Sequence, residues 1–139
     1  MLLHIVARGK IGRSPEAELV DRYVKRIAWP VRVTELSERA AAPSLPPGSV
    51  SVLLDEKGEA VSSVELARKL ESWRDGARRE CRFSIGGADG HGSNAREAAD
   101  LLLSFGPATW PHLLVRAMLA EQLFRATSIL ANHPYHREG

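Results

Sequence analysis

The amino-acid sequence predicts an α/β fold built on a mainly parallel sheet with helices on both faces. Short apolar segments typical of buried strands alternate along the chain with amphipathic segments of helical period, and most of the latter begin with a capping residue. Strands that alternate with helices of roughly 10–15 residues favour parallel pairing. Neither an internal repeat nor a linker divides the 139 residues, so we expect one domain, residues 1–139.

The first three elements follow from local patterns. Leu2 to Ala7 is a short apolar run and predicts a buried strand. Ser14 before Pro15 is typical of a helix start, because serine caps free N–H groups and proline suits the first turn. This helix is expected to end near Ile27. Residues 31–36 alternate apolar and polar side chains and predict a half-exposed strand.

The middle of the chain predicts a loop, a strand and a helix. Residues 40–48 contain three prolines and are expected to form a loop. Residues 50–54 predict a buried strand that residues 55–58 close. The Ser-x-x-Glu spacing over residues 62–65 is a capping box, which predicts a helix reaching about residue 75.

The last third of the chain predicts two strands and two helices. Residues 81–85 predict a strand that runs directly into a glycine-rich loop, residues 86–92. An Asn-x-x-Glu capping spacing predicts a helix over residues 94–103, and a short strand is expected over residues 108–110. The longest helix is expected from about Leu113 to Ala131. It is apolar around much of its circumference, so we expect it to pack on the sheet and on a second subunit.

Composition bounds the class of protein. Cys81 is the only cysteine, which excludes an internal disulfide and a multi-cysteine zinc site, and its apolar-leaning neighbours indicate a buried core residue. No apolar run approaches the ~18 residues of a membrane span, and the N-terminal residues lack a secretory pattern. We therefore expect a cytoplasmic protein with no membrane partner.

The charge of the chain is mildly basic, with a formal net charge of +2 and a pI near 9.0. The recurring arginines fit either a phosphate-facing surface or an ordinary surface of mixed charge. They are Arg8, Arg13, Arg22, Arg26, Arg32, Arg116, Arg125 and Arg137.

The rule that ligands bind outside the carboxyl ends of parallel strands selects three segments. They are the turn after Leu54, the glycine loop over residues 86–92 and the segment over residues 105–110. The glycines let the backbone approach a ligand closely, although a permissive turn accounts for them equally well. No Gly-Lys-Ser/Thr follows, so the loop is not a P-loop. Residues 105–110 offer apolar walls and free backbone groups, which suit an adenine ring.

The C-terminal tail concentrates polar and aromatic chemistry. His133, Tyr135, His136 and Arg137 suit the stacking and hydrogen bonding of an unpaired RNA base. A disordered terminus is the plain alternative. The two histidines have i, i+3 spacing, but no acidic or cysteine ligand lies beside them, so we predict no metal site.

Four motifs resemble those of the bacterial ribosomal RNA large-subunit methyltransferase H family. They are Ile85-Gly86-Gly87-x-x-Gly90, Pro111-His112-x-Leu114-Val115-Arg116, Glu121-Gln122-Leu123-Phe124-Arg125-Ala126 and Asn132-His133-Pro134-Tyr135-His136-Arg137. The resemblance covers the whole chain. It implies the SPOUT class with a carboxyl-terminal trefoil knot, S-adenosylmethionine as cofactor, and a homodimer. It also implies methylation of N3 of a pseudouridine in large-subunit ribosomal RNA, in the assembled ribosome.

The resemblance also implies roles for particular residues. The cofactor is expected to contact Leu54, Gly86, Phe105, Gly106, Pro107, Ala108, Thr109 and Trp110. The catalytic candidates are His133 or His136 for proton handling, Arg137 or Arg125 for charge stabilisation, and Tyr135 to stack on the base. Glu121 and Arg125 have the spacing of a helical ion pair, which is an alternative role for that arginine.

This chain departs from the family pattern in three places. It is short around residues 40–48, His91 is unusual in the glycine loop, and Trp110 takes a place where another apolar residue is expected.

Two other functions fit the same pattern. A non-catalytic RNA-binding or ribosome-assembly protein needs the basic surface without a cofactor pocket. A nucleotide hydrolase needs a phosphate-binding lysine and metal-binding carboxylates that the sequence lacks around its glycine loop.

Overall fold

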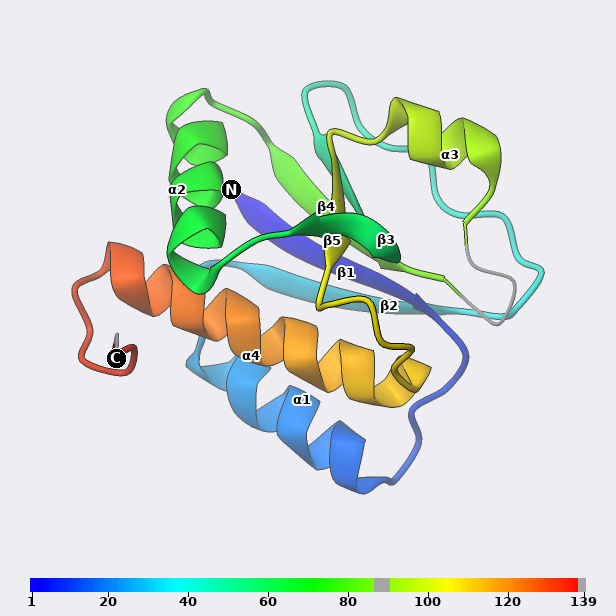
Figure 1. Ribbon diagram of the computed structural model, residues 1–139, viewed down its shortest axis with the longest axis horizontal. Coiled ribbons are helices and arrows are strands. Elements are labelled where there is room, and N and C mark those ends of the chain that lie inside the picture. The colour runs from blue at the N-terminus through cyan, green and yellow to red at the C-terminus, as the bar shows by residue number, and fades with distance from the viewer. Residues whose placement is uncertain (87–90, 138–139) are drawn as a thin grey trace.

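The computed structural model describes residues 1–86 and 91–137 and confirms the predicted α/β architecture (Figure 1). The described strands form one five-stranded sheet in the order β2-β1-β4-β3-β5, and all neighbours are parallel. The strands are β1 (Leu2–Arg8), β2 (Val31–Leu36), β3 (Val50–Ala60), β4 (Glu80–Ile85) and β5 (Leu101–Ser104). The helices are α1 (Pro15–Arg26), α2 (Ser63–Asp75), α3 (Ser93–Ala98) and α4 (His112–Leu130). Within the described residues, no helix combines the length and apolar character that crossing a membrane requires.

Capping interactions explain where α1 and α2 begin. Ser14 Oγ accepts a hydrogen bond from the Ala17 N–H at 3.1 Å. Ser62 and Glu65 form the predicted capping box, with the Glu65 N–H donating to Ser62 Oγ at 3.1 Å and the Ser62 N–H donating to the Glu65 carboxylate at 3.4 Å. Both predicted helix starts are therefore confirmed, because local side-chain chemistry is enough to fix them.

The main core lies between one face of the sheet and helices α2 and α4 (Figure 1). Alternate residues of the strands supply it, as Leu3 and Phe83 do, and Leu70 of α2 and Leu123 of α4 pack against them without exposed surface. Cys81 belongs to this cluster and is fully buried, as predicted. Helix α1 packs on α4 from outside, and α3 lies across the sheet from these three helices (Figure 1).

The opposite face of the sheet buries a polar network. His4 Nδ1 lies 3.0 Å from the Glu80 carboxylate, and its Nε2 lies 2.7 Å from Thr34 Oγ1. Arg82 is paired with the same carboxylate at 3.2 Å and donates to the main-chain carbonyl of Pro43 at 2.5 Å. The proline-rich loop has no helix or strand, as predicted, and these side chains anchor it over the sheet.

The predicted end of the third strand is wrong. Residues 55–58 do not close β3, which continues to Ala60 after a register shift between Leu54 and Glu59. A Cβ at Gly58 would lie 2.5 Å from the Leu102 carbonyl oxygen, so only glycine lets β3 approach β5 this closely. The polar side chains suggested a turn, but they belong to an irregular strand.

The predictions between residues 94 and 110 are also wrong. Helix α3 begins after Gly92 and ends at Ala98, so the expected cap over residues 94–97 lies inside the helix, and residues 101–103 do not continue it. Those three leucines form most of β5, where pairing with β3 buries Leu101 and Leu103. A short apolar run does not distinguish helix from strand by periodicity. The strand expected over residues 108–110 is an exposed loop.

Candidate active site

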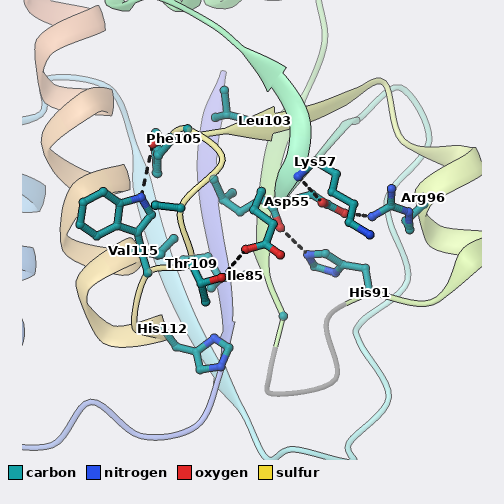
Figure 2. A pocket seen from close by; sticks show the side chains of 16 residues that line it. Asp55, Lys57, Ile85, His91, Arg96, Leu103, Phe105, Thr109, His112 and Val115 are labelled. Atoms are coloured by element: carbon teal, nitrogen blue, oxygen red, sulfur yellow. Dashed lines mark hydrogen bonds and ion pairs between the residues drawn. The ribbon is translucent and has the colours of Figure 1, made fainter.

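A cavity of about 340 Å³ opens at the carboxyl edge of the sheet (Figure 2). Three neighbouring strands end there, since β4, β3 and β5 are adjacent and parallel. The cavity is lined by residues 54–57 of β3, the end of β4 at residues 85–86, and Leu103 of β5 with residues 105–106 and 108–110 behind it. Helix α4 adds His112 and Val115, and residues 91 and 96 complete the far wall.

The structure brings together the three segments that follow strand ends. Leu54 and Gly86 line the cavity, and so do all residues from Phe105 to Trp110 except Pro107. Gly87 and Gly90, which the sequence also marks, lie outside the described residues. The parallel sheet is the physical reason for this convergence, because it carries all strand ends to one edge.

One wall of the cavity is held to β3 by hydrogen bonds from the loop after β5. Thr109 Oγ1 donates to the Glu56 carboxylate at 2.8 Å. Ser104 Oγ lies 3.1 Å from the Glu56 carbonyl oxygen and accepts a hydrogen bond from the Gly106 N–H at 3.0 Å. Trp110 is 42 % exposed, and its indole N–H donates to the Phe105 carbonyl at 3.3 Å. The loop is therefore fixed although it has no regular secondary structure.

The opposite wall is held to β3 by His91 and Arg96 (Figure 2). His91 Nε2 lies 3.1 Å from the Leu54 carbonyl oxygen, and because a carbonyl only accepts, this nitrogen carries the proton. Burial lowers the pKa of His91 below its ordinary value, which favours the neutral ring. Arg96 of α3 forms an ion pair with Asp55, whose side chain is 10 % exposed.

The cavity combines apolar surfaces with carboxylates at its edge. Leu103, Ile85 and Val115 supply apolar lining. Glu56 supplies negative charge, whereas the charge of Asp55 is paired with Arg96, and Lys57 adds a cation to the same lining. Such a site suits a ligand with a flat apolar ring at one end and a cationic group at the other. The sequence selected the turn after Leu54 as a ligand-binding place, but it named only Leu54 as a cofactor contact and neither carboxylate.

The C-terminal tail is folded back by the end of α4. Asn132 adopts a left-handed conformation with φ of 57°, and its N–H donates to the Ile129 carbonyl at 3.1 Å. The His133 N–H donates to the Ser128 carbonyl at 2.9 Å. These two bonds form a Schellman motif, in which asparagine takes the place that glycine commonly holds. The motif reverses the chain, so residues 133–137 return toward α4.

The tail packs on a polar cluster of α4. Arg125 donates to Glu121 at 2.6 Å, which confirms the predicted ion pair, and to His136 Nδ1 at 3.1 Å. The Tyr135 ring lies over the same guanidinium at 4.8 Å and packs on Phe124 at 4.5 Å. The pKa of Tyr135 is raised to about 12, mainly by burial and in second place by a hydrogen bond with Tyr23, so the phenol stays protonated. Arg137 is exposed.

The structure does not bring the tail to the cavity of the same chain. Val115 lines the cavity, whereas the tail contacts Arg125 and Glu121 farther along α4. Ten residues of helix separate Val115 from Arg125, a rise of about 15 Å. The predicted cofactor residues and the predicted catalytic residues therefore form two separate groups in one chain.

Comparisons with known proteins agree on one family. A sequence profile described as "Predicted SPOUT methyltransferase" matches residues 1–136. The chain is 66% identical over 140 residues to a protein of Rhizorhabdus wittichii and 64% identical over 142 residues to one of Erythrobacter litoralis, in both cases over the full length of each chain. It is 47% identical to a Maricaulis maris protein over 156 residues, which cover 99% of this chain and 100% of the relative. All three relatives bear the name "Ribosomal RNA large subunit methyltransferase H".

Proposed function

The chain belongs to the SPOUT methyltransferase family, and from this premise we propose that it methylates N3 of a pseudouridine in large-subunit ribosomal RNA with S-adenosylmethionine as the methyl donor. The names of the relatives support the ribosomal RNA as substrate. One structural observation carries the proposal: segments from three strand ends line a single cavity at the carboxyl edge of the sheet. The proposal places the enzyme in the cytoplasm, where assembled ribosomes are found.

The residues around the cavity fit S-adenosylmethionine. The apolar lining from Ile85, Leu103 and Val115 suits an adenine ring, and the backbone of residues 105–110 suits its polar edge. The carboxylate of Glu56 favours the cationic part of the donor, since Asp55 is already paired with Arg96. When bound, the donor supplies an electrophilic methyl group on a sulfonium. Leu54, Gly86 and residues 105–110 would hold it and keep water away from that group.

The tail would provide the chemistry for the nucleoside. An imide nitrogen attacks well only as its anion, so groups that stabilise negative charge on the base accelerate transfer. His136 Nδ1 accepts from Arg125, and His133 Nδ1 accepts from the Tyr135 N–H at 3.2 Å. Each neutral ring therefore carries its proton on Nε2. In this arrangement, His133, which is exposed, would donate a hydrogen bond to a carbonyl oxygen of the base, with Arg137 adding positive charge. The Nε2 atom of His136 is buried among the described residues, so this ring would instead hold Arg125 in place.

A homodimer would join the two groups of residues that one chain keeps apart. A groove of about 280 Å³ lies between α1 and α4, with Leu19 and Tyr23 on one side and Leu114 and Met118 on the other. A second copy of α4 packed here would bury apolar surface and carry the partner's tail toward this cavity. The active site would then be shared, with the donor held by one subunit and the base positioned by the other.

We expect Met118→Glu to convert the dimer into a monomer. The substitution places a charge in the apolar groove, where an unpaired carboxylate is costly to bury, and light scattering at micromolar protein would report the smaller mass. Val33→Glu is the matched control, because Val33 is 38 % exposed on the edge strand β2 and should leave the mass unchanged. A wild-type monomer, or a dimeric Met118→Glu protein, would contradict this arrangement.

Methyl transfer tests the proposed function directly. Ribosomes from a strain that lacks the enzyme would be incubated with the protein and radiolabelled S-adenosylmethionine, and the RNA would be digested to nucleosides for mass spectrometry. We expect label in a single nucleoside, N3-methylpseudouridine. Donor binding without any transfer to RNA would instead favour a non-catalytic role in ribosome assembly, and label in a different nucleoside would refute the assignment of the target atom.

A further inference from the structure

A basic loop lies beside the cavity and is not part of it. Residues 9–13 follow β1, and Ala7 of β1 pairs with Ile85 of β4, which lines the cavity. Neighbouring strands lie about 4.8 Å apart, so the loop leaves the sheet one strand away from Gly86. Figure 2 shows β1 passing behind the cavity and its chain continuing below His112.

A buried arginine fixes the shape of this loop. The sequence suggested Arg116 for a phosphate-facing surface, but it is 1 % exposed. Its Nη2 donates to the Gly9 carbonyl at 3.2 Å and its Nη1 to the Glu35 carboxylate at 2.5 Å. The same carboxylate accepts the Ile11 N–H at 2.8 Å. Arg116 therefore holds the loop through buried hydrogen bonds, and it is the next residue of α4 after Val115, which lines the cavity.

Glu35 is suited to hold this arrangement at neutral pH. The hydrogen bond from the Ile11 N–H is the largest cause of a pKa below the ordinary value, and Arg116 and Lys10 lower it further. The carboxylate thus stays charged against the buried guanidinium. Gly9, with φ of 90°, takes a conformation that residues with side chains rarely adopt, so the turn depends on glycine as well as on the ion pair.

Lys10 and Arg13 stand exposed on the loop that this pair holds. Neither side chain has a hydrogen bond or ion pair with the residues that the structure describes. By contrast, Arg8 donates to the carbonyls of Ser37 and Ala40 and is occupied within the fold. Lys10 lies close enough to Glu35 to lower its pKa but forms no ion pair with it among the described residues. Two exposed cations on a loop of fixed shape, next to the site where a nucleoside must lie, suit the phosphates on either side of that nucleoside.

We infer that Lys10 and Arg13 bind the phosphate backbone of the RNA substrate beside the cavity, and that the buried Arg116–Glu35 pair positions the loop that presents them. This inference rests on the proposed function and adds to it the surface on which the RNA docks. Phosphate contacts fix the register of a nucleic acid on a protein, whereas the tail would read the base itself.

The test compares two double variants that lose the same charge. Lys10→Ala with Arg13→Ala removes both cations of the loop, and Lys25→Ala with Arg26→Ala removes two from the opposite end of α1, about 18 Å away along the helix. For the loop variant we expect KM for ribosomes to rise about tenfold, with kcat and S-adenosylmethionine affinity unchanged. The negative slope of log kcat/KM against log salt concentration should become shallower by about 1.4 to 1.8, the loss of two phosphate contacts. The control variant should match the wild type.

A third variant tests the positioning role. Glu35→Gln keeps an acceptor for Ile11 but removes the charge facing Arg116, and we expect it to raise KM for RNA without changing kcat. Added to the loop variant, it should raise KM no further, because its effect passes through Lys10 and Arg13. Independent, additive effects would mean that the pair serves stability alone, which would overturn this half of the inference.

The remaining outcomes are decisive as well. An unchanged KM in the loop variant, or an equal rise in both double variants, would overturn the docking assignment. If the wild-type protein transfers no methyl group to RNA, the proposed function fails, and fluorescence anisotropy with large-subunit ribosomal RNA then tests the loop by itself. In that assay, equal affinity of wild type and loop variant would exclude RNA as the partner of this surface and leave an acidic protein as the alternative.

Discussion

Replacing Gly86 by leucine is expected to abolish S-adenosylmethionine binding while the chain stays folded. Gly86 directly follows β4 and lines the cavity together with the segment over residues 105–110. An isobutyl group there takes up space that the ligand needs. We expect the dissociation constant to rise by about 100-fold or more, equivalent to about 2.7 kcal/mol. Isothermal titration measures the loss, and circular dichroism checks the fold.

Gly92→Leu is the matched control for this experiment. Gly92 has an ordinary φ of −69°, a Cβ built on it meets nothing within 4 Å, and it does not line the cavity. The same side chain placed there should leave donor affinity within a few-fold of the wild type. Unchanged affinity in the Gly86→Leu protein would remove this residue from the donor site, and an unfolded Gly92→Leu protein would show that the region does not tolerate leucine at all.

Removing residues 135–139 is expected to eliminate methyl transfer and to spare donor binding. The tail contacts Glu121 and Arg125, about 9 and 15 Å along α4 from the cavity lining at Val115, so the donor site of the same chain does not depend on it. We expect kcat/KM for ribosomes to fall at least about 100-fold, and donor affinity to stay within a few-fold. Single-turnover transfer and isothermal titration measure the two quantities separately.

Tyr135→Phe separates stacking from hydroxyl chemistry in the same segment. Phenylalanine keeps the ring that lies on Arg125 and Phe124 and loses only the hydroxyl, which is 3.4 Å from the Glu121 carboxylate. We expect transfer to stay within a few-fold of the wild type. Full activity of the truncated chain would show that the tail has no catalytic role. A parallel loss of donor affinity on truncation would place the tail within the donor site instead.

Elements fixed by local chemistry were predictable from the sequence. The start of α1 depends on Ser14, and the start of α2 depends on the capping pair Ser62 and Glu65. Both starts were predicted correctly. The segment after Arg96 was not, because Leu101 to Leu103 become a strand only by pairing with β3, some fifty residues earlier in the chain. Tertiary pairing decides such short apolar runs, and no local pattern records it.

The candidate site, like the fold, was predictable in part: its lining segments could be predicted, and the contacts that hold them could not. The rule that ligands bind at the ends of parallel strands selected the turn after Leu54, the glycine loop and residues 105–110 without a structure, and the family resemblance named Leu54 and Gly86 within them. The hydrogen bonds that hold the cavity walls could not be predicted from the sequence, since partners such as Thr109 and Glu56 are 53 residues apart. The trefoil knot, which the family resemblance implies, stays a prediction.

The position of the single thiol has a practical consequence. Cys81 lies between β1 and β3 with no exposed surface, and burial raises its pKa far above the ordinary value. The folded chain therefore offers no thiolate to an alkylating reagent, and the wild-type protein is a ready background for engineered cysteines. A fluorophore attached through a cysteine introduced on the tail would report changes in the surroundings of the tail. In the unlabelled wild type, the rate at which Cys81 reacts would measure how often the centre of the sheet opens.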